Sequence, residues 1–111
     1  MSDYHEPAGE LSQQTREYTR ALKTLIEEVE AVEWYQQRVD LSKDTALKKI
    51  MAHNRDEEIE HACMALEWLR RNMPGWDEEL RTYLFTDGEI TELEDEEKED
   101  NGDDGSLGIS K

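Results

Sequence analysis

The sequence predicts an all-α protein built from two long antiparallel helices and one shorter helix. Apolar residues recur at steps of three and four over two long stretches, as they do along one face of an amphipathic helix. No stretch alternates between apolar and polar residues with a period of two, so we expect no β-sheet. The chain has 111 residues, which allows at most one modest domain.

The first predicted helix extends from about Ser12, a candidate N-cap, to about Asp40. It contains about 28 residues and is therefore roughly 42 Å long. Its apolar stripe consists of Leu22, Leu25, Ile26, Val29, Val32 and Val39.

The second predicted helix follows the cap candidates Ser42 and Asp44 and ends near Asn72, because Pro74 and Gly75 cannot continue a helix. Its stripe consists of Leu47, Ile50, Met51, Ala62, Ala65, Trp68 and Leu69. A shorter third helix is predicted from about Trp76 to Phe85, with Trp76, Leu80, Tyr83 and Leu84 as its apolar residues.

Charge is distributed unevenly and marks the boundaries of the folded region. The chain has 29 Asp and Glu against 13 Lys and Arg, and its net charge is −16. Acidic residues dominate from residue 87 onward, so we expect residues 94–104 to be a disordered, extended acidic linker. Residues 1–10 are expected to form a flexible arm, which leaves residues 11–93 as the helical domain.

The composition also excludes several classes of protein. An excess of acidic residues argues against binding to nucleic acid or to an anionic membrane, since both need clustered Lys and Arg. No run approaches 18 apolar residues, and the first residues do not resemble a secretory signal. A single cysteine, Cys63, cannot form an internal disulfide, so we expect a soluble, cytoplasmic protein.

A hairpin of two helices is half of a bundle, because each helix can bury its stripe against only one neighbour. A two-fold dimer would complete a four-helix bundle, and we therefore expect a homo-oligomer.

Three polar residues interrupt the apolar stripes in a way that suggests a metal site. Glu58 and His61 lie one turn apart in the middle of the second stripe, and Glu28 lies beside the centre of the first. Di-iron sites in four-helix bundles use one Glu from each of two helices and a Glu-x-x-His pair from each of the other two. This chain supplies half of that set, so a dimer would supply enough ligands for two metal ions.

A metal site is not the simplest explanation for the histidines and glutamates of these helices. A Glu-x-x-His pair occurs often by chance on a charged helix, and His53 at the edge of the stripe fits a structural or surface role better than ligation. Glu27, Glu30 and Glu33 would ordinarily form a solvated face.

Four segments of the chain resemble the encapsulated ferritins: residues 27–35, 53–61, 66–72 and 80–86. The resemblance covers about residues 20–90 and implies a half-ferritin fold. It also implies a ferroxidase centre that forms only between two subunits, in a ring-like homodecamer. By resemblance, Glu28, Glu58 and His61 are the iron ligands and Tyr35 lies beside the centre, while Glu27, Glu30 and Trp34 line the route by which iron enters.

The end of the chain resembles the cargo peptide of this family. Residues 105–111, Gly105 to Lys111, would dock inside an encapsulin shell, with Leu107 and Ile109 as apolar anchors on an extended segment. The implied function is oxidation of Fe(II) to Fe(III) by dioxygen, with two irons per dimer, inside an encapsulin nanocompartment that stores the mineral. A non-catalytic metal-binding protein and a structural cargo protein are the alternatives.

Overall fold

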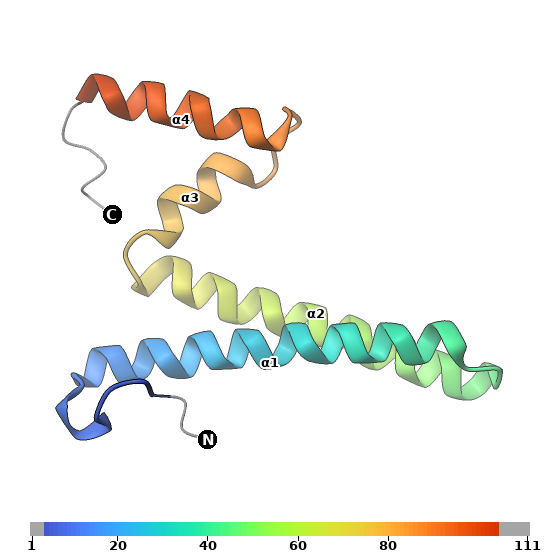
Figure 1. The fold of residues 1–111 in the computed structure, drawn as a ribbon. Helices are drawn as coiled ribbons and strands as arrows, with labels where there is room; N and C mark the ends of the chain where they lie inside the picture. Colours follow the sequence, from blue (N-terminus) through green and yellow to red (C-terminus); the bar gives the residue numbers. More distant parts are fainter. Residues whose placement is uncertain (1–3, 105–111) are drawn as a thin grey trace. The chain divides into compact units, whose positions relative to one another are not determined.

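The computed structural model describes residues 4–104 and shows an all-helical chain (Figure 1). A short 3-10 helix, η1, spans Ala8–Glu10, and the α-helices follow as α1 (Gln13–Leu41), α2 (Thr45–Asn72), α3 (Trp76–Tyr83) and α4 (Ile90–Asp104). No residue from 4 to 104 belongs to a strand, which confirms the predicted fold class. The chain divides into two compact units, one ending at Leu69 and one beginning at Arg70.

The ends of the two long helices lie where the capping residues predict. The Ser12 hydroxyl accepts a hydrogen bond of 3.0 Å from the Thr15 backbone N–H at the start of α1. Asp44 does the same for Leu47 at the start of α2, at 2.9 Å. The Arg16 guanidinium donates to the Ala8 carbonyl, so part of the arm predicted to be flexible is held against the first turns of α1.

Helices α1 and α2 lie side by side and antiparallel in the first unit (Figure 1). Two contacts between the helices establish this. The Tyr18 and Trp68 rings pack edge-on near one end, with their centroids 6.4 Å apart. Nearer the other end, the Arg55 guanidinium donates a hydrogen bond of 2.8 Å to the side-chain oxygen of Gln36. Among the described residues only Ala65 and Leu69 are buried, and Leu69 is the one that is fully enclosed.

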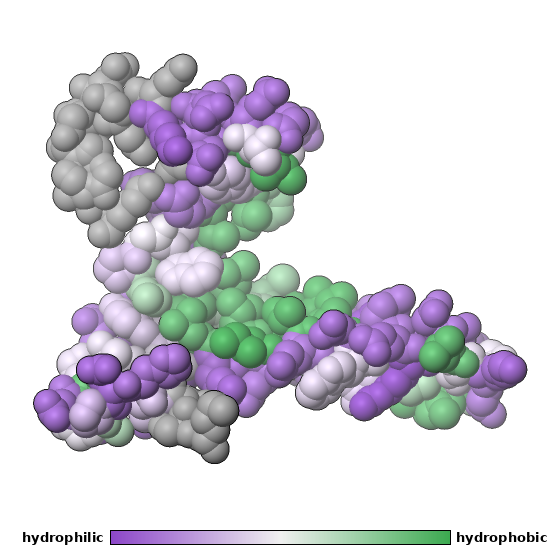
Figure 2. All heavy atoms as spheres, viewed as in Figure 1, coloured by the Kyte–Doolittle hydropathy of each residue, from purple (hydrophilic) through white to green (hydrophobic). Residues whose placement is uncertain are grey.

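Much of the predicted core is exposed in the single chain. The exposed apolar residues include Ile26, Val29, Leu47 and Ile50, each about half accessible, and Figure 2 shows hydrophobic residues at the surface of the α1–α2 hairpin. Exposure of this extent is what the half-bundle interpretation requires, because a partner must cover those side chains.

In the second unit, Gly75 is the N-cap of α3 and has a φ of 103°, a conformation that suits glycine. Asp77 in the first turn of α3 accepts hydrogen bonds from Arg70 and Arg81. The Trp76 indole donates to the Met73 sulfur at 3.3 Å. Helix α3 contacts α4.

Residues 94–104 were predicted to form an extended, disordered linker, but in the structure they belong to α4. Three local features account for the helix. The Glu89 carboxylate caps its start by accepting from the Glu92 backbone N–H at 2.9 Å. Lys98 lies one turn after Glu94, and glutamate itself has a high helix propensity. The cargo peptide predicted at residues 105–111 lies outside the described residues. None of the described helices is long and apolar enough to cross a membrane.

Candidate metal centre

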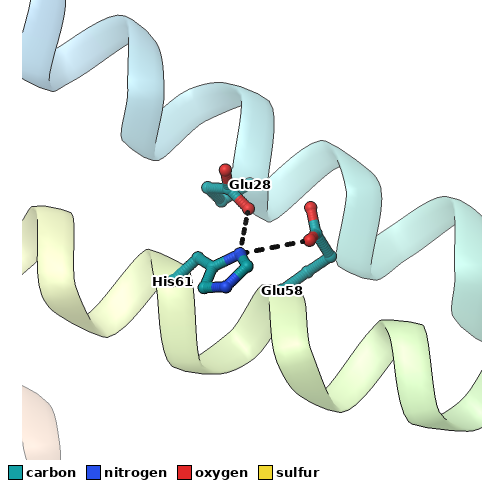
Figure 3. A group of neighbouring side chains, drawn as sticks. All are labelled: Glu28, Glu58 and His61. Carbon is teal, nitrogen blue, oxygen red and sulfur yellow. Dashed lines mark ion pairs between the residues drawn. The ribbon is translucent and has the colours of Figure 1, made fainter.

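Three potential metal ligands converge midway along the α1–α2 hairpin (Figure 3). Glu58 and His61 project from neighbouring turns of α2, and Glu28 faces them from α1. The His61 Nδ1 atom lies 3.3 Å from Glu58 Oε1 and 3.6 Å from Glu28 Oε2. One ligand atom from each residue lies within 4.8 Å of the other two. The structure therefore brings together the three residues that the sequence predicts as the centre.

The carboxylates of the centre are partly withdrawn from water. The side chains of Glu28 and Glu58 are 21% and 24% exposed, and that of His61 is 46% exposed. Glu28 Oε2 is buried without a hydrogen-bond partner among the described residues. A buried carboxylate oxygen without a donor is costly, and a cation would remove that cost.

The pKa of Glu28 also indicates a site for a cation. The neighbouring Glu58 carboxylate, which can accept a hydrogen bond from the protonated form, raises the pKa of Glu28 most. Burial and the negative charge of Glu58 raise this pKa further, whereas His61 lowers it. Two carboxylates that repel each other across a small space form a site for a cation.

The donor set suits a first-row transition metal. Two carboxylates and one imidazole can bind iron, manganese or zinc, and carboxylate-rich sets favour iron and manganese. Three ligands from one chain leave coordination positions open for further ligands. A second chain related by two-fold symmetry would double the set to four carboxylates and two imidazoles.

A cavity of about 360 Å³ lies beside Glu58, between α1 and α2. Its lining residues are Ala31, Trp34, Tyr35, Arg38, Asn54 and Glu58. Tyr35 and Trp34, which the resemblance associates with the centre, thus share a cavity with one of the ligands. The Arg38 guanidinium carbon lies 5.1 Å from the centre of the Tyr35 ring, a cation–π geometry. Arg38 was not predicted to belong to the site, although its position three residues after Tyr35 places both on one helix face.

Glu27 and Glu30 are exposed on α1 and belong to neither cluster of potential ligands found among the described residues. The role of these two residues in iron entrance therefore stays a prediction from the resemblance.

The second cluster consists of the exposed residues Glu57, Glu60 and His61 of α2, and it was not predicted from the sequence. His53 Nε2 lies 3.6 Å from Glu57 Oε1, so this histidine contacts an acid at the helix surface. Residues four apart lie on the same face of a helix. The spacing of Glu57 and His61 was therefore the sequence feature from which this cluster could have been predicted.

The chain is similar to known ferritin-like proteins. The family model described as EncFtn-like matches residues 3–87. The chain is 61% identical to a protein of Thermotoga maritima named "Ferritin-like protein", covering all of this chain and 99% of that one. It is 55% identical to the "Encapsulated ferritin-like protein" of Rhodospirillum rubrum, covering 96% of this chain and 77% of the relative.

A solved structure shares the fold. A crystal structure of a protein from Nitrosomonas europaea superposes with a TM-score of 0.78 at 56% identity, covering 80% of this chain and 98% of the other. At this identity, the similarity extends from fold to sequence.

Proposed function

The chain belongs to the EncFtn-like family, the encapsulated ferritins, and we propose that it is a ferroxidase that oxidises Fe(II) to Fe(III) with dioxygen. The observation that carries this proposal is the convergence of Glu28, Glu58 and His61 from two helices, with a buried carboxylate oxygen that lacks a donor. The reaction would occur at a di-iron site shared between two subunits, because one chain supplies half of the ligands that such a site uses.

The carboxylates of the centre would favour oxidation of the bound iron. Anionic oxygen ligands stabilise Fe(III) more than Fe(II), so they favour electron transfer from iron to dioxygen. Each Fe(II) loses one electron, so two irons together would supply one electron pair to dioxygen. Iron is the substrate, so Fe(III) must leave before the centre can act again. The negative charge of Glu58 contributes to the raised pKa of Glu28, and a new cation would offset the same repulsion in the empty centre.

Residues around the centre receive roles under the same proposal. Tyr35 lines the cavity beside Glu58 and would contact the reacting groups. Glu27 and Glu30 would attract Fe(II) along α1, and Trp34 would line the same route.

The proposal is tested by loading the protein with Fe(II) without oxygen and then admitting oxygen while absorbance and oligomer mass are followed together. Glu58→Ala and His61→Ala should abolish or strongly reduce iron oxidation while helicity is largely retained. Asp56→Asn is the matched control, because this acid lies on the same helix with a side chain that is 66% exposed.

Two results would point to another function. Stoichiometric binding of iron without oxygen consumption would indicate a non-catalytic metal-binding protein. Dimerisation without metal, combined with no specific iron binding, would indicate a structural cargo protein. Full oxidation in both ligand variants would refute the assigned centre.

We also propose that an encapsulin shell is the partner and that Fe(III) mineral collects in its lumen. The family name supports the shell, and Gly105 to Lys111 would be the docking segment. The substitutions Leu107→Asp and Ile109→Asp together should end co-purification with the shell while leaving oxygen uptake of the free protein nearly unchanged. Encapsulation that survives the double substitution would place the docking segment elsewhere.

A further inference from the structure

The cavity beside Glu58 carries opposite charges on its walls. Among the described residues that line it, Glu58 is the acidic one and Arg38 the basic one. The remaining lining residues are Ala31, Trp34, Tyr35 and Asn54. Neither Glu28 nor His61 belongs to this lining, so Glu58 is the ligand that the cavity and the metal centre share.

Two side chains in the cavity have hydrogen-bond donors to spare. The Arg38 guanidinium contacts the Tyr35 ring but forms no hydrogen bond or ion pair with any residue that the structure describes. The Asn54 side chain likewise forms no hydrogen bond within residues 4–104. Arg38 belongs to α1 and Asn54 to α2, so donors are available from both helices. A cavity with a few convergent polar groups is typical of a site for a small ligand.

The charge of Arg38 restricts which ligand can enter. A guanidinium is always protonated, so it repels Fe(II) and attracts an anion. Its contact with the Tyr35 ring, at 5.1 Å, holds the charge in place and leaves N–H groups available to an acceptor. The cavity therefore suits a negatively charged ligand.

Glu58 makes the binding of an anion depend on the metal centre. When the centre is empty, the ionised carboxylates of Glu28 and Glu58 carry two negative charges and repel an anion in the adjoining cavity. One divalent cation cancels both charges. An anion would then have Arg38 on one side and a neutral centre on the other.

We propose that this cavity binds a small oxyanion while a cation occupies the centre, with Arg38 and Asn54 as its donors. The planar guanidinium matches two oxygens of an oxyanion, and the side-chain amide adds a further donor. The inference rests on the proposed function, which allows two sources of the anion. Reduction of dioxygen yields anionic oxygen species, and phosphate is an oxygen ligand that accompanies Fe(III) in water.

The first test is a calorimetric titration of the full chain with sulfate, at constant ionic strength. Sulfate is a small, redox-silent oxyanion, and Zn²⁺ serves as the redox-silent cation. We expect sulfate to bind the Zn²⁺-loaded protein about tenfold or more tightly than the metal-free protein. Because coupling between two binding sites is reciprocal, saturating sulfate should tighten Zn²⁺ binding by the same factor.

Substitutions identify the donors. Arg38→Gln and Asn54→Leu should each weaken sulfate binding to the Zn²⁺-loaded protein by about tenfold or more, because each removes a donor to a charged ligand. Arg38→Lys should restore part of the affinity, since lysine keeps the charge but lacks the planar fork. The control Arg20→Gln removes the same charge from an exposed position of α1, roughly 27 Å away, and should bind sulfate as the wild type does.

The second test distinguishes the two sources of the anion. Oxygen uptake during Fe(II) oxidation is measured with and without phosphate in the wild type and in Arg38→Gln. If the natural anion derives from dioxygen, phosphate should compete with it and slow uptake in the wild type alone. If the natural anion is phosphate, it should bind the Zn²⁺-loaded protein more tightly than sulfate does and should not slow uptake. An equal effect of phosphate in Arg38→Gln would contradict the assigned site.

Three results of the sulfate titration would overturn the proposal: equal affinity with and without Zn²⁺, undiminished affinity in Arg38→Gln, or an equal loss in Arg20→Gln. Zn²⁺ binding without sulfate is measured on every variant and shows that the centre is intact. Zn²⁺ binding with no sulfate binding would refute the oxyanion site, as expected if a partner chain fills the cavity, and would leave the metal centre standing. Absence of Zn²⁺ binding in the wild type would contradict the metal centre itself.

Discussion

Replacing Glu28 with glutamine should stabilise the metal-free protein and weaken metal binding at the same time. The substitution keeps the size of the side chain and removes one of two carboxylates that face each other in the centre. Metal-free wild type retains their repulsion, whereas the variant can donate an amide hydrogen to Glu58. If Glu28 served only in packing, the substitution would instead destabilise the metal-free protein.

The magnitude follows from the separation of the groups. Two unit charges 4.8 Å apart, the upper limit for the ligand atoms here, repel by about 3.5 kcal/mol at an effective dielectric constant of 20 and by about 0.9 kcal/mol in water. The two side chains are about one-fifth to one-quarter exposed, and His61 offsets part of the repulsion. We therefore expect the metal-free variant to gain about 1 kcal/mol in free energy of unfolding.

The gain should depend on pH in a defined direction. The pKa of Glu28 is raised in the folded protein, so the folded state holds this proton more tightly than the unfolded chain. Stability of the wild type therefore falls as pH rises from the ordinary value through the raised value, and the loss is complete above it. The advantage of Glu28→Gln should be greatest near neutral pH and shrink as the solution becomes acidic.

Urea unfolding followed by circular dichroism, at one protein concentration and with a chelator present, measures this difference. Redox-silent Zn²⁺ at about 100 times its dissociation constant should add about 2.7 kcal/mol to the wild type and much less to the variant. Asp56→Asn is the control and should change neither value. A metal-free Glu28→Gln protein less stable than the wild type, with an unchanged response to Zn²⁺, would refute the assignment of Glu28 to a cation site.

Two further predictions concern the fold. Leu69→Ala should lower the free energy of unfolding by about 3 kcal/mol, because Leu69 is fully enclosed, while Ile90→Ala at an exposed position should cost less than about 0.5 kcal/mol; equal losses in denaturant unfolding would contradict this packing. Arg81 and Arg70 hold the pKa of Asp77 below its usual range, so its carboxylate stabilises the fold above the ordinary pKa and loses that effect as pH falls through the lowered one. Asp77→Asn should therefore speed hydrogen exchange in α3 near neutral pH, and the difference from the wild type should disappear in acid; a difference that persists in acid would show another cause.

The long helices could be predicted from the sequence because their signals are local. Ser12 and Asp44 are caps whose hydrogen bonds reach only three residues along the chain, and Pro74 with Gly75 prevents α2 from continuing. The apolar periodicity placed Glu28, Glu58 and His61 on facing surfaces, and the antiparallel pairing brought them together.

The differences arise where two local tendencies compete. High charge in residues 94–104 favours an extended chain, yet the Glu89 cap and the helix propensity of glutamate produce α4. Arg38 and Ala31 could not be assigned to a cavity from periodicity, because a cavity depends on how two helices approach each other. The Glu57, Glu60 and His61 cluster was missed because acids on a charged helix ordinarily face solvent without a ligand.

The stoichiometry of Fe(II) binding tests the shared centre most directly. Native mass spectrometry of the protein titrated with Fe(II) in the absence of oxygen reports the number of irons on each oligomer. We predict that tight binding saturates at about two irons per dimer, with additional irons bound weakly at acidic surface positions. A stable monomer that holds two irons tightly would contradict a centre built from two chains.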